Sequence, residues 1–330
     1  MNNFAIGVDL GGTNLRIAAV DESGKILDAV TTGTEVARGR DSVIDEMCAA
    51  IQELSARFSV DKKLTGIGIG VPGIIDLQRG MLRESPNLPG WHDFPVQKEI
   101  EKRLGTHVVL ENDANAAAYG EYWLGAGRDH QGGDLCMITL GTGVGGGLIL
   151  GGKVHHGMTG MAGELGHVTV YPDGHACGCG NHGCLEQYAS ATAVKRMVRE
   201  RIAQGNAPLL EKAMKQFDEV SPELVFRLAM AGDGESKEIF AQVGQALGTS
   251  IAGWINALNV RIYVIGGGVS GAWDAFAPTM MAEIGKRSFV YRATTTGKAH
   301  GTAGTTVVTR AVLGGDAGLL GSARLAMLRS

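Results

Sequence analysis

The stretch FAIGVDLGGTNLRIAAVD, at residues 4–21, decides which fold the sequence predicts. Residues 4–10 and 15–21 are apolar runs of strand length, and the Gly-Gly pair between them is typical of a tight hairpin turn. A third apolar run, ILDAVTT at 26–32, follows the turn residues ESGK. We therefore expect three consecutive strands in a meander.

The segments that follow predict a helix and two further strands. Between Asp41 and Phe58 apolar residues recur at helical spacing, and Asp41 or Ser42 would cap the helix. The runs LTGIGIGV (64–71) and HVVLEN (107–112) are typical of buried strands, and a Pro-Gly pair ends the first of them. We expect these elements to form an open sheet backed by the helix.

A second set of elements follows the first. It comprises a helix at 113–125, a strand at 134–140, a glycine-rich turn at 141–147, a cysteine-rich loop at 174–186, a long helix at 235–259, a strand at 261–270 and an amphipathic segment at 316–329. Because 330 residues exceed the usual size of one hydrophobic core, we expect two domains with a cleft between them. The predicted boundaries are 1–113 plus 315–330 for a small N-terminal α/β domain, and 114–314 for a larger C-terminal α/β domain with the cysteine loop.

Charge and composition exclude several classes of function. With a net charge of -4 and a pI near 6.1, the chain has no basic field to bind a nucleic acid. No apolar run approaches the roughly 18 to 20 residues that a membrane span needs. The segment MNNFAIGVDL has neither the basic region nor the cleavage site of a signal peptide. We expect a cytoplasmic protein with no nucleic-acid or membrane partner, and a small phosphorylated ligand accompanied by a metal remains compatible with this charge.

Glycine-rich turns follow three of the predicted strands. In DLGGTN, Asp9 ends a strand, and the next two glycines let backbone N–H groups approach a phosphate, while Thr13 and Asn14 add side-chain donors. Asp9 would hold Mg²⁺ through water. The turn GTGVGGG at 141–147 repeats this arrangement, and GGG at 266–268 joins a strand to an expected helix. Each turn alone is compatible with an ordinary loop, but the three together favour a nucleotide site.

Asp113 lies at a strand-to-helix junction in ENDANAAAYGE, with Asn112 and Asn115 beside it. An isolated aspartate at such a junction is most often a helix N-cap. A sugar kinase, however, needs a carboxylate within hydrogen-bond reach of the attacking hydroxyl and polar groups that orient the sugar ring. Both interpretations are open, and the amide neighbours favour the second.

The cysteine loop predicts a structural zinc site. Its candidate ligands have the spacing H-x9-C-x-C-x4-C of a closed Cys₃His site and are His167, Cys177, Cys179 and Cys184. His175 or His182 would be an alternative ligand, and buried reduced thiols without a metal are the alternative to a zinc site. Four protein ligands leave no open position for catalysis, so the zinc would fix the loop. A rigid loop would aim Glu164 and Glu186 at sugar hydroxyls.

The motifs DLGGTN, GVPG, ENDANAAA, GTGVGGG, GELGH and CGCGNHGCLEQYAS, in this order, resemble those of the ROK family of repressors, open reading frames and kinases. The resemblance runs essentially from residue 5 to the C-terminus, and the cysteine motif looks most like that of bacterial glucokinases. It implies a two-domain actin-like ATPase (ribonuclease H-like) fold with a central interdomain cleft. It also implies ATP-dependent phosphoryl transfer to the 6-hydroxyl of a hexose, glucose first. Fructokinases and N-acetylhexosamine kinases of the family share much of the pattern.

The resemblance also implies roles for individual residues. Asp113 would be the catalytic base. The sugar would be bound by Gly73, Asn87, Asn112, Asp113, Glu164, His167 and Glu186. ATP and Mg²⁺ would be bound by Asp9, Gly11, Gly12, Thr13, Asn14, Thr142, Gly143, Gly267 and Gly268. One ring nitrogen of His167 would bind zinc, with Cys177, Cys179 and Cys184, while the other faces the sugar. The family is commonly dimeric or tetrameric, so a homodimer or homotetramer is expected.

A sugar-responsive transcriptional regulator of the same family is the alternative from another class. Such regulators carry an additional N-terminal helix-turn-helix, whereas this sequence is expected to reach its first strand at Phe4 and its phosphate hairpin at Asp9. Many regulators also lose phosphate-loop residues, while both hairpins are intact here. We therefore expect a kinase, in which domain closure on the sugar keeps water from consuming ATP.

Overall fold

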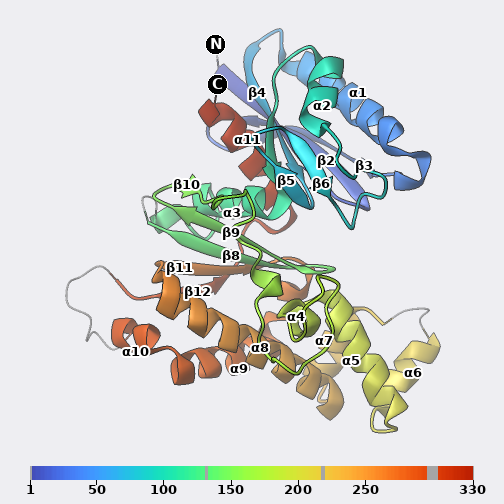
Figure 1. Cartoon of the computed structure of the whole chain (residues 1–330), viewed down its shortest axis with the longest axis vertical. Helices are drawn as coiled ribbons and strands as arrows, with labels where there is room; N and C mark the ends of the chain where they lie inside the picture. Colours follow the sequence, from blue (N-terminus) through green and yellow to red (C-terminus); the bar gives the residue numbers. More distant parts are fainter. Residues whose placement is uncertain (1, 131–132, 217–219, 296–303, 330) are drawn as a thin grey trace. The chain divides into compact units, whose positions relative to one another are not determined.

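The protein is described by a computed structural model that covers residues 2–130, 133–216, 220–295 and 304–329. The chain folds into two compact units, each with strands and helices (Figure 1). Unit 1 comprises Met1–Leu135, Gly147–Gly163 and Val312–Ser330, and unit 2 comprises Cys136–Gly146 and Glu164–Ala311.

The centre of unit 1 is a five-stranded sheet with the strand order β3-β2-β1-β4-β7. Its strands are β1 (Asn2–Leu10), β2 (Asn14–Asp21), β3 (Ile26–Gly33), β4 (Lys62–Val71) and β7 (Val109–Asn112). The first three pair antiparallel in sequence, which confirms the predicted meander. β4 pairs parallel with both β1 and β7, so the carboxyl ends of these three strands meet at one edge of the sheet.

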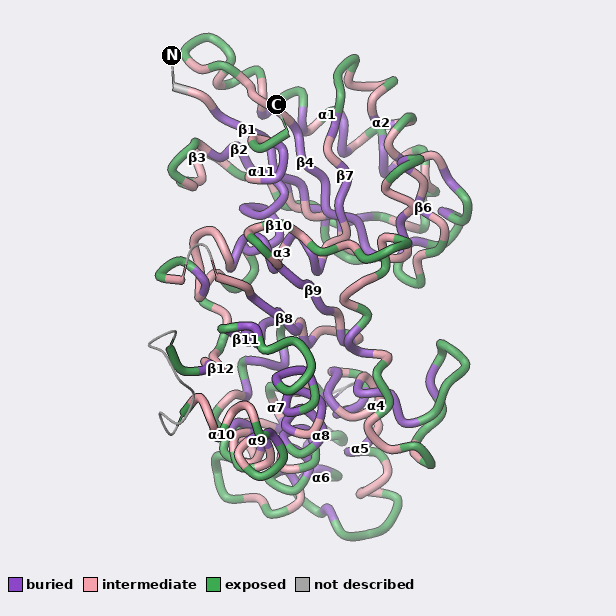
Figure 2. Tube along the Cα trace, turned by 60° about the vertical axis from the view of Figure 1, so that its left-hand side comes forward, coloured by how far each residue is buried: buried purple, intermediate pink, exposed green. Residues whose placement is uncertain are grey.

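Helices cover both faces of this sheet. One apolar core joins the sheet with α1 (Arg40–Phe58) and α2 (Val96–Leu104). A second apolar cluster joins β1 and β2 with α11 (Ala317–Arg329). The buried trace of β1, β4 and α11 in Figure 2 shows this layered interior. A small two-stranded sheet of β5 (Ile74–Asp76) and β6 (Met81–Glu84), which the sequence did not lead us to expect, follows β4.

Glycines set how closely α11 approaches its neighbours. A Cβ atom on Gly68 of β4 would lie 1.9 Å from the carbonyl oxygen of Ser322 in α11. A Cβ atom on Gly321 of α11 would lie 1.7 Å from the carbonyl oxygen of Ala116 in α3 (Asp113–Trp123). Both distances are far below van der Waals contact, so no larger residue fits without moving the backbone.

The compact units divide the chain differently from the domain boundaries expected at residues 113 and 315, which stay a prediction. Helix α3 belongs to unit 1, because it packs against α11 and because its buried Glu121 binds the chain that leads into α11. The Glu121 carboxylate accepts hydrogen bonds from the backbone N–H groups of Val312 and Leu313, the latter at 2.7 Å. These contacts depend on residues about 190 positions apart, so local sequence patterns do not reveal them.

Helix α1 begins one residue before the expected cap. Its N-cap is Gly39, which makes no side-chain capping hydrogen bond, so the prediction that Asp41 or Ser42 caps the helix is wrong. The Asp41 carboxylate instead lies 3.5 Å from the guanidinium of Arg103, which belongs to the last turn of α2. Asp41 therefore forms an ion pair with a residue of another helix and does not cap its own helix.

Unit 2 contains the helices between residues 186 and 295 and most of a second sheet. The second five-stranded sheet has the order β10-β9-β8-β11-β12, and β9 continues from unit 2 into unit 1. Its strands are β8 (Leu135–Leu140), β9 (Val144–Leu150), β10 (Lys153–Val154), β11 (Ile262–Gly266) and β12 (Val307–Arg310). The helices are α4 (Glu186–Ala189), α5 (Ala191–Ala203), α6 (Pro208–Gln216), α7 (Pro222–Met230), α8 (Gly234–Leu258), α9 (Trp273–Arg287) and α10 (Phe289–Thr295).

The long helix α8 packs closely against α9. A Cβ atom on Gly244 would lie 2.4 Å from the carbonyl oxygen of Phe276, which explains a glycine inside a helix that is otherwise rich in apolar residues. In the part of the chain that the structure describes, none of the helices is both long enough and apolar enough to cross a lipid bilayer.

Candidate active site and metal centre

The first glycine hairpin joins β1 to β2 at the carboxyl edge of the unit 1 sheet. The backbone N–H of Gly11 donates to the carbonyl oxygen of Asn14 at 2.9 Å, which closes the turn. Thr34, at the end of β3, supports it, because its hydroxyl donates to the Gly11 carbonyl at 2.6 Å and its backbone N–H donates to that of Thr13. Thr34 is buried and was missed by the sequence reasoning, which treated the hairpin as self-contained.

Two residues of the predicted site meet at this hairpin. A Cβ atom on Gly12 would lie 2.7 Å from the carbonyl oxygen of Asn87, so only glycine fits the contact. Gly12 was expected to bind the nucleotide and Asn87 the sugar. The structure therefore brings a predicted phosphate loop and a predicted sugar residue into contact within unit 1.

Asp9 lies at the end of β1 in an environment that disfavours its charge. Burial raises the pKa of the Asp9 carboxyl, and the guanidinium of Arg16, its cross-strand partner, only partly opposes the rise. Arg16 also binds Asp316, with 2.6 Å between Nη2 and Oδ1. A buried carboxylate whose charge is disfavoured fits the role of a group that binds a cation, and Mg²⁺ is a hard cation that prefers oxygen ligands.

We expect Asp9→Asn to make the ligand-free protein more stable at neutral pH. A carboxyl whose pKa is raised by folding destabilises the folded state increasingly as the pH rises above its ordinary value, and the full penalty is reached above the raised value. Asparagine removes the charge and has nearly the same size as aspartate. Thermal unfolding of both proteins across pH would measure the effect. The advantage of the variant should disappear below the ordinary pKa of 3.8, where both side chains are neutral. A variant that is less stable than wild type at pH 7 would contradict the expectation.

The junction of β7 and α3 holds Asn112 and Asp113. Asn112 is the N-cap of α3, because its Oδ1 accepts hydrogen bonds from the backbone N–H groups of Ala114 and Asn115 at 3.0 and 3.2 Å. Asp113 is the first residue of the helix, so the interpretation of Asp113 as the N-cap is wrong. Its half-buried carboxylate accepts the backbone N–H of Ala114 at 2.9 Å.

The same junction brings in Gly73. The Nδ2 group of Asn112 donates to the carbonyl oxygen of Gly73 at 3.3 Å. Gly73 has a φ of 115°, and a Cβ atom there would lie 2.3 Å from the carbonyl oxygen of Glu84, so only glycine fits. Unit 1 thus places Gly73, Asn112 and Asp113 together beyond the carboxyl ends of β4 and β7.

The predicted metal ligands form a compact cluster in unit 2. Among the described residues, the ligand atoms of His167, Cys177, Cys179 and Cys184 all lie within 4.8 Å of one another. His175 and His182, which the sequence left open as ligands, are not members of this cluster. Burial raises the pKa of the Cys184 thiol to about 12, whereas the backbone N–H of Asn181 lowers the pKa of exposed Cys179.

The spacing of these atoms fits zinc. Tetrahedral Zn–S bonds of about 2.3 Å place two sulfur atoms roughly 3.8 Å apart. The Sγ atoms of Cys179 and Cys184 are 3.7 Å apart, and Sγ of Cys177 is 3.6 Å from Nδ1 of His167. Asn181 supports the site, because its Nδ2 lies 3.4 Å from Sγ of Cys184. These residues would hold a four-coordinate ion.

The acidic residues that flank the loop lie close to it. Oε2 of Glu164 lies 4.0 Å from Nε2 of His167, the ring nitrogen on the side away from the Cys177 contact. Oε2 of Glu186 accepts the backbone N–H of Val144 at 3.0 Å, in the second glycine hairpin. A Cβ atom on Gly143 would lie 2.3 Å from the same Glu186 oxygen. Glu186 therefore connects the cysteine loop with that hairpin.

The remaining predicted nucleotide residues also lie in unit 2. The carbonyl oxygen of Thr142 accepts a hydrogen bond from the hydroxyl of Thr192 at 2.8 Å. Gly267 has a φ of 82°, and a Cβ atom there would lie 2.5 Å from the carbonyl oxygen of Leu140, just before the second hairpin. Gly268 opens the short helix that follows β11, and a Cβ atom there would meet no described heavy atom within 4 Å, which leaves its backbone accessible. Two glycine turns thus lie together at the end of β8.

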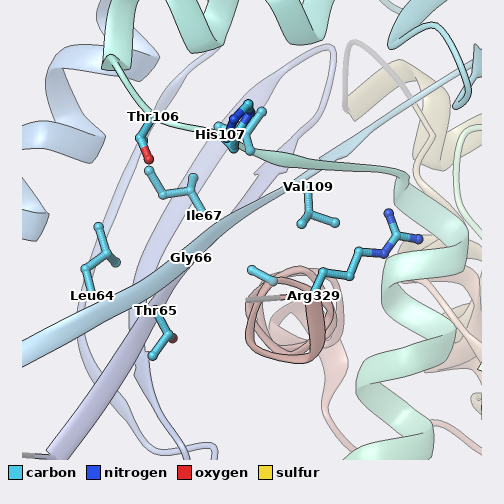
Figure 3. Close-up of a pocket in the computed structure, with 10 residues that line it drawn as sticks. Leu64, Thr65, Gly66, Ile67, Thr106, His107, Val109 and Arg329 are labelled. Atoms are coloured by element: carbon cyan, nitrogen blue, oxygen red, sulfur yellow. The ribbon is translucent and has the colours of Figure 1, made fainter.

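A cavity of about 200 Å³ lies elsewhere in unit 1, and none of the predicted site residues lines it. Figure 3 shows Thr65, His107 and Arg329 around it. It is formed by the first half of β4, the start of β7 and the end of α11, at the edge of the sheet opposite the hairpin. The cavity is therefore separate from the candidate active site.

Sequence reasoning also missed a buried pair beside Asp113. Oε2 of Glu111 lies 2.8 Å from Nε2 of His156, and the Glu111 side chain is 1% exposed. Glu111 reads as an ordinary strand residue, and 45 positions separate it from His156. The only signal available was a charged residue inside an otherwise apolar strand.

Comparison with known proteins shows the family to which the chain belongs. A model of the ROK family matches residues 5–328. A glucokinase of Thermotoga maritima is 40% identical over 323 residues, which cover 97% of this chain and 96% of that protein. A putative xylose repressor of a Caldicellulosiruptor species is 30% identical and covers 86% of this chain and 71% of the repressor.

A solved structure gives the same result at the level of the fold. The ROK family glucokinase of Streptomyces griseus, in complex with glucose and AMPPNP, matches with a TM-score of 0.79 and 33% identity. The match covers 99% of this chain and 100% of that one. The expectation of a two-domain, actin-like ATPase α/β fold is confirmed.

Proposed function

Because the chain belongs to the ROK family, we propose that it is an ATP-dependent sugar kinase whose preferred acceptor is the 6-hydroxyl of glucose. The observation that carries the proposal is the β7–α3 junction, where Asn112 caps the helix and donates to the Gly73 carbonyl, and Asp113 begins the helix with a half-buried carboxylate. The Thermotoga relative is named a glucokinase, and the Streptomyces structure contains glucose and AMPPNP.

In the proposed reaction Asp113 accepts the proton of the sugar hydroxyl as its oxygen attacks the γ-phosphorus of ATP. The bond between that phosphorus and the β–γ bridging oxygen breaks, and ADP leaves. The β1–β2 hairpin and the β8–β9 hairpin supply backbone N–H groups to the phosphates, as their glycines permit. Asp9 would hold Mg²⁺ through water, and the ion would supply neutralisation of the phosphate charge. Positioning and electrostatic stabilisation carry phosphoryl transfer of this kind.

Sugar hydroxyls are polar on every side of the ring, so recognition needs several fixed acceptors and donors. We assign this role to Gly73, Asn87, Asn112, Glu164, His167 and Glu186. The contact between Glu164 and Nε2 of His167 supports the assignment, because it leaves Nδ1 for a zinc ion. Zinc, when bound, would hold the loop in one shape and take no part in the transfer.

A sugar-responsive regulator is the second candidate, because the Caldicellulosiruptor relative is named a putative xylose repressor. The intact phosphate turns favour the kinase, since a regulator that only senses sugar has no need for them. Fructokinase and N-acetylhexosamine kinase activities use the same chemistry and differ in the shape of the sugar site. We propose that the protein is cytoplasmic, which agrees with reduced thiols at the cysteine loop. We also propose that it forms a homodimer or homotetramer.

A coupled assay of ADP production tests the proposal. The full chain would be given ATP and Mg²⁺ with glucose, mannose, fructose, N-acetylglucosamine, N-acetylmannosamine or allose. We expect glucose to give the highest kcat/KM. A higher kcat/KM for another hexose would make that hexose the preferred substrate and leave the kinase proposal standing. Absence of ADP production with all six sugars would overturn the kinase proposal.

A further inference from the structure

A buried acid and a histidine lie next to the proposed base, and the proposed reaction assigns them no role. Glu111 lies in β7, two residues before Asp113, and its side chain is 1% exposed. Its Oε2 lies 2.8 Å from Nε2 of His156. A histidine nitrogen that carries its proton would donate to this carboxylate oxygen.

The other carboxylate oxygen of Glu111 binds one residue before and one residue after the proposed base. Oε1 of Glu111 accepts the backbone N–H of Asn112 at 3.0 Å and the side-chain Nδ2 of Asn115 at 3.1 Å. Asn112 in turn caps α3 and donates to Gly73. One carboxylate therefore fixes the backbone immediately before Asp113 and a side chain two residues after it.

Such a hydrogen-bond network serves to orient the residues around Asp113 more than to stabilise the fold. A carboxylate that leaves water needs hydrogen bonds to offset its desolvation, and an apolar residue in a buried strand position is usually at least as stabilising. The hydrogen-bond donors to Oε1 of Glu111 belong to Asn112 and Asn115. The second oxygen of Glu111 is held by His156, which comes from the segment after β10 in the same unit.

We propose that Glu111 and His156 are positioning residues of the kinase. They hold the β7–α3 junction so that the Asp113 carboxylate meets the sugar hydroxyl at bonding distance. The inference rests on the proposed function, because it assigns the pair to the base of that reaction. No proton is transferred between Glu111 and His156 in this role, and neither residue touches the substrate.

Two amide substitutions at His156 separate this role from a general structural one. The side-chain nitrogen of glutamine is three bonds from Cβ, as Nε2 of histidine is, so His156→Gln keeps a donor for Glu111. The nitrogen of asparagine is one bond shorter, so His156→Asn keeps the polarity but loses the contact. Both amides suit a half-buried site, where the His156 side chain is 26% exposed.

The measurements are kcat and KM for glucose and ATP, with the melting temperature of each variant. We expect His156→Asn to lower kcat about 10- to 100-fold, because a small misplacement of a reacting group costs up to about 100-fold. The KM for ATP should stay within about twofold, and His156→Gln should keep kcat within about threefold of wild type. His155→Asn, at the exposed neighbouring position, is the control and should match wild type.

The outcomes are distinct. The inference would be overturned if His156→Asn had the kcat of wild type, or if the asparagine and glutamine variants lost kcat equally. In either case, activity of the wild-type protein would leave the proposed function intact. Wild-type protein that produces no sugar-dependent ADP would overturn both. If His156→Asn does not fold, Asn115→Ala, which removes a donor to Glu111 from the other side, should show the same fall in kcat, and an unchanged kcat there would count against the network.

Discussion

Asp113→Asn is expected to lower sugar-dependent ADP production by about 10³-fold while sugar binding stays measurable. General-base catalysis contributes roughly 10²- to 10⁴-fold, and asparagine cannot accept a proton from the sugar hydroxyl at neutral pH. The substitution preserves size and an acceptor oxygen for the backbone N–H of Ala114, which Asp113 binds at 2.9 Å. Helix α3 should form as before, because Asn112 caps it.

Steady-state kinetics and calorimetric titration with glucose would measure the two effects separately. Asp274→Asn is the matched control, because Asp274 also lies in the first turn of a helix, α9, and is exposed. It should leave both kcat and sugar affinity unchanged. Turnover of Asp113→Asn at the wild-type rate would remove Asp113 from the role of base and leave the family assignment untouched.

The sequence predicted those parts of the molecule that depend on local patterns. Alternating and apolar runs gave the strands β1 to β4, β7, β8 and β11, and the helical spacing gave α1 and α8 within a few residues. The cluster of His167, Cys177, Cys179 and Cys184 was predictable because three of its members fall within eight positions of one loop.

Contacts between distant segments were not predictable in the same way. The glycines of GIGIGV look like strand residues, but Gly68 is needed because α11 lies against it. The Asp41 carboxylate was expected to cap α1 and pairs with Arg103 instead. The pair of Glu111 with His156 belongs to the same class, since no periodicity links a strand residue with a loop residue 45 positions later.

Cys179→Ser is expected to abolish stoichiometric zinc binding and to weaken sugar binding by about tenfold or more. Serine is a poor zinc ligand, and loss of one ligand from a closed site leaves the ion weakly held. Cys179 is exposed, so the change removes almost no packing. A loss of affinity would therefore report on the metal and not on the apolar core.

Zinc content by elemental analysis and glucose affinity by calorimetry would test this. Cys136→Ala is the control, because Cys136 is a buried thiol of β8 outside the ligand cluster. It should lower the melting temperature through lost packing while zinc stays at one ion per chain. A native protein without zinc would sink the expectation, as would a Cys179→Ser variant that keeps its ion.

The expected loss of sugar affinity follows from how the loop connects its parts. His167 contributes Nδ1 to the metal cluster and directs Nε2 toward Glu164, while Glu186 binds the backbone of Val144 in the second hairpin. Without the ion, the ring of His167 would lose the bond that orients it, so the Glu164 carboxylate and the Nε2 group of His167 would no longer share one fixed geometry. Adding zinc back to chelator-treated wild type should restore glucose affinity, and the same treatment should leave Cys179→Ser unchanged.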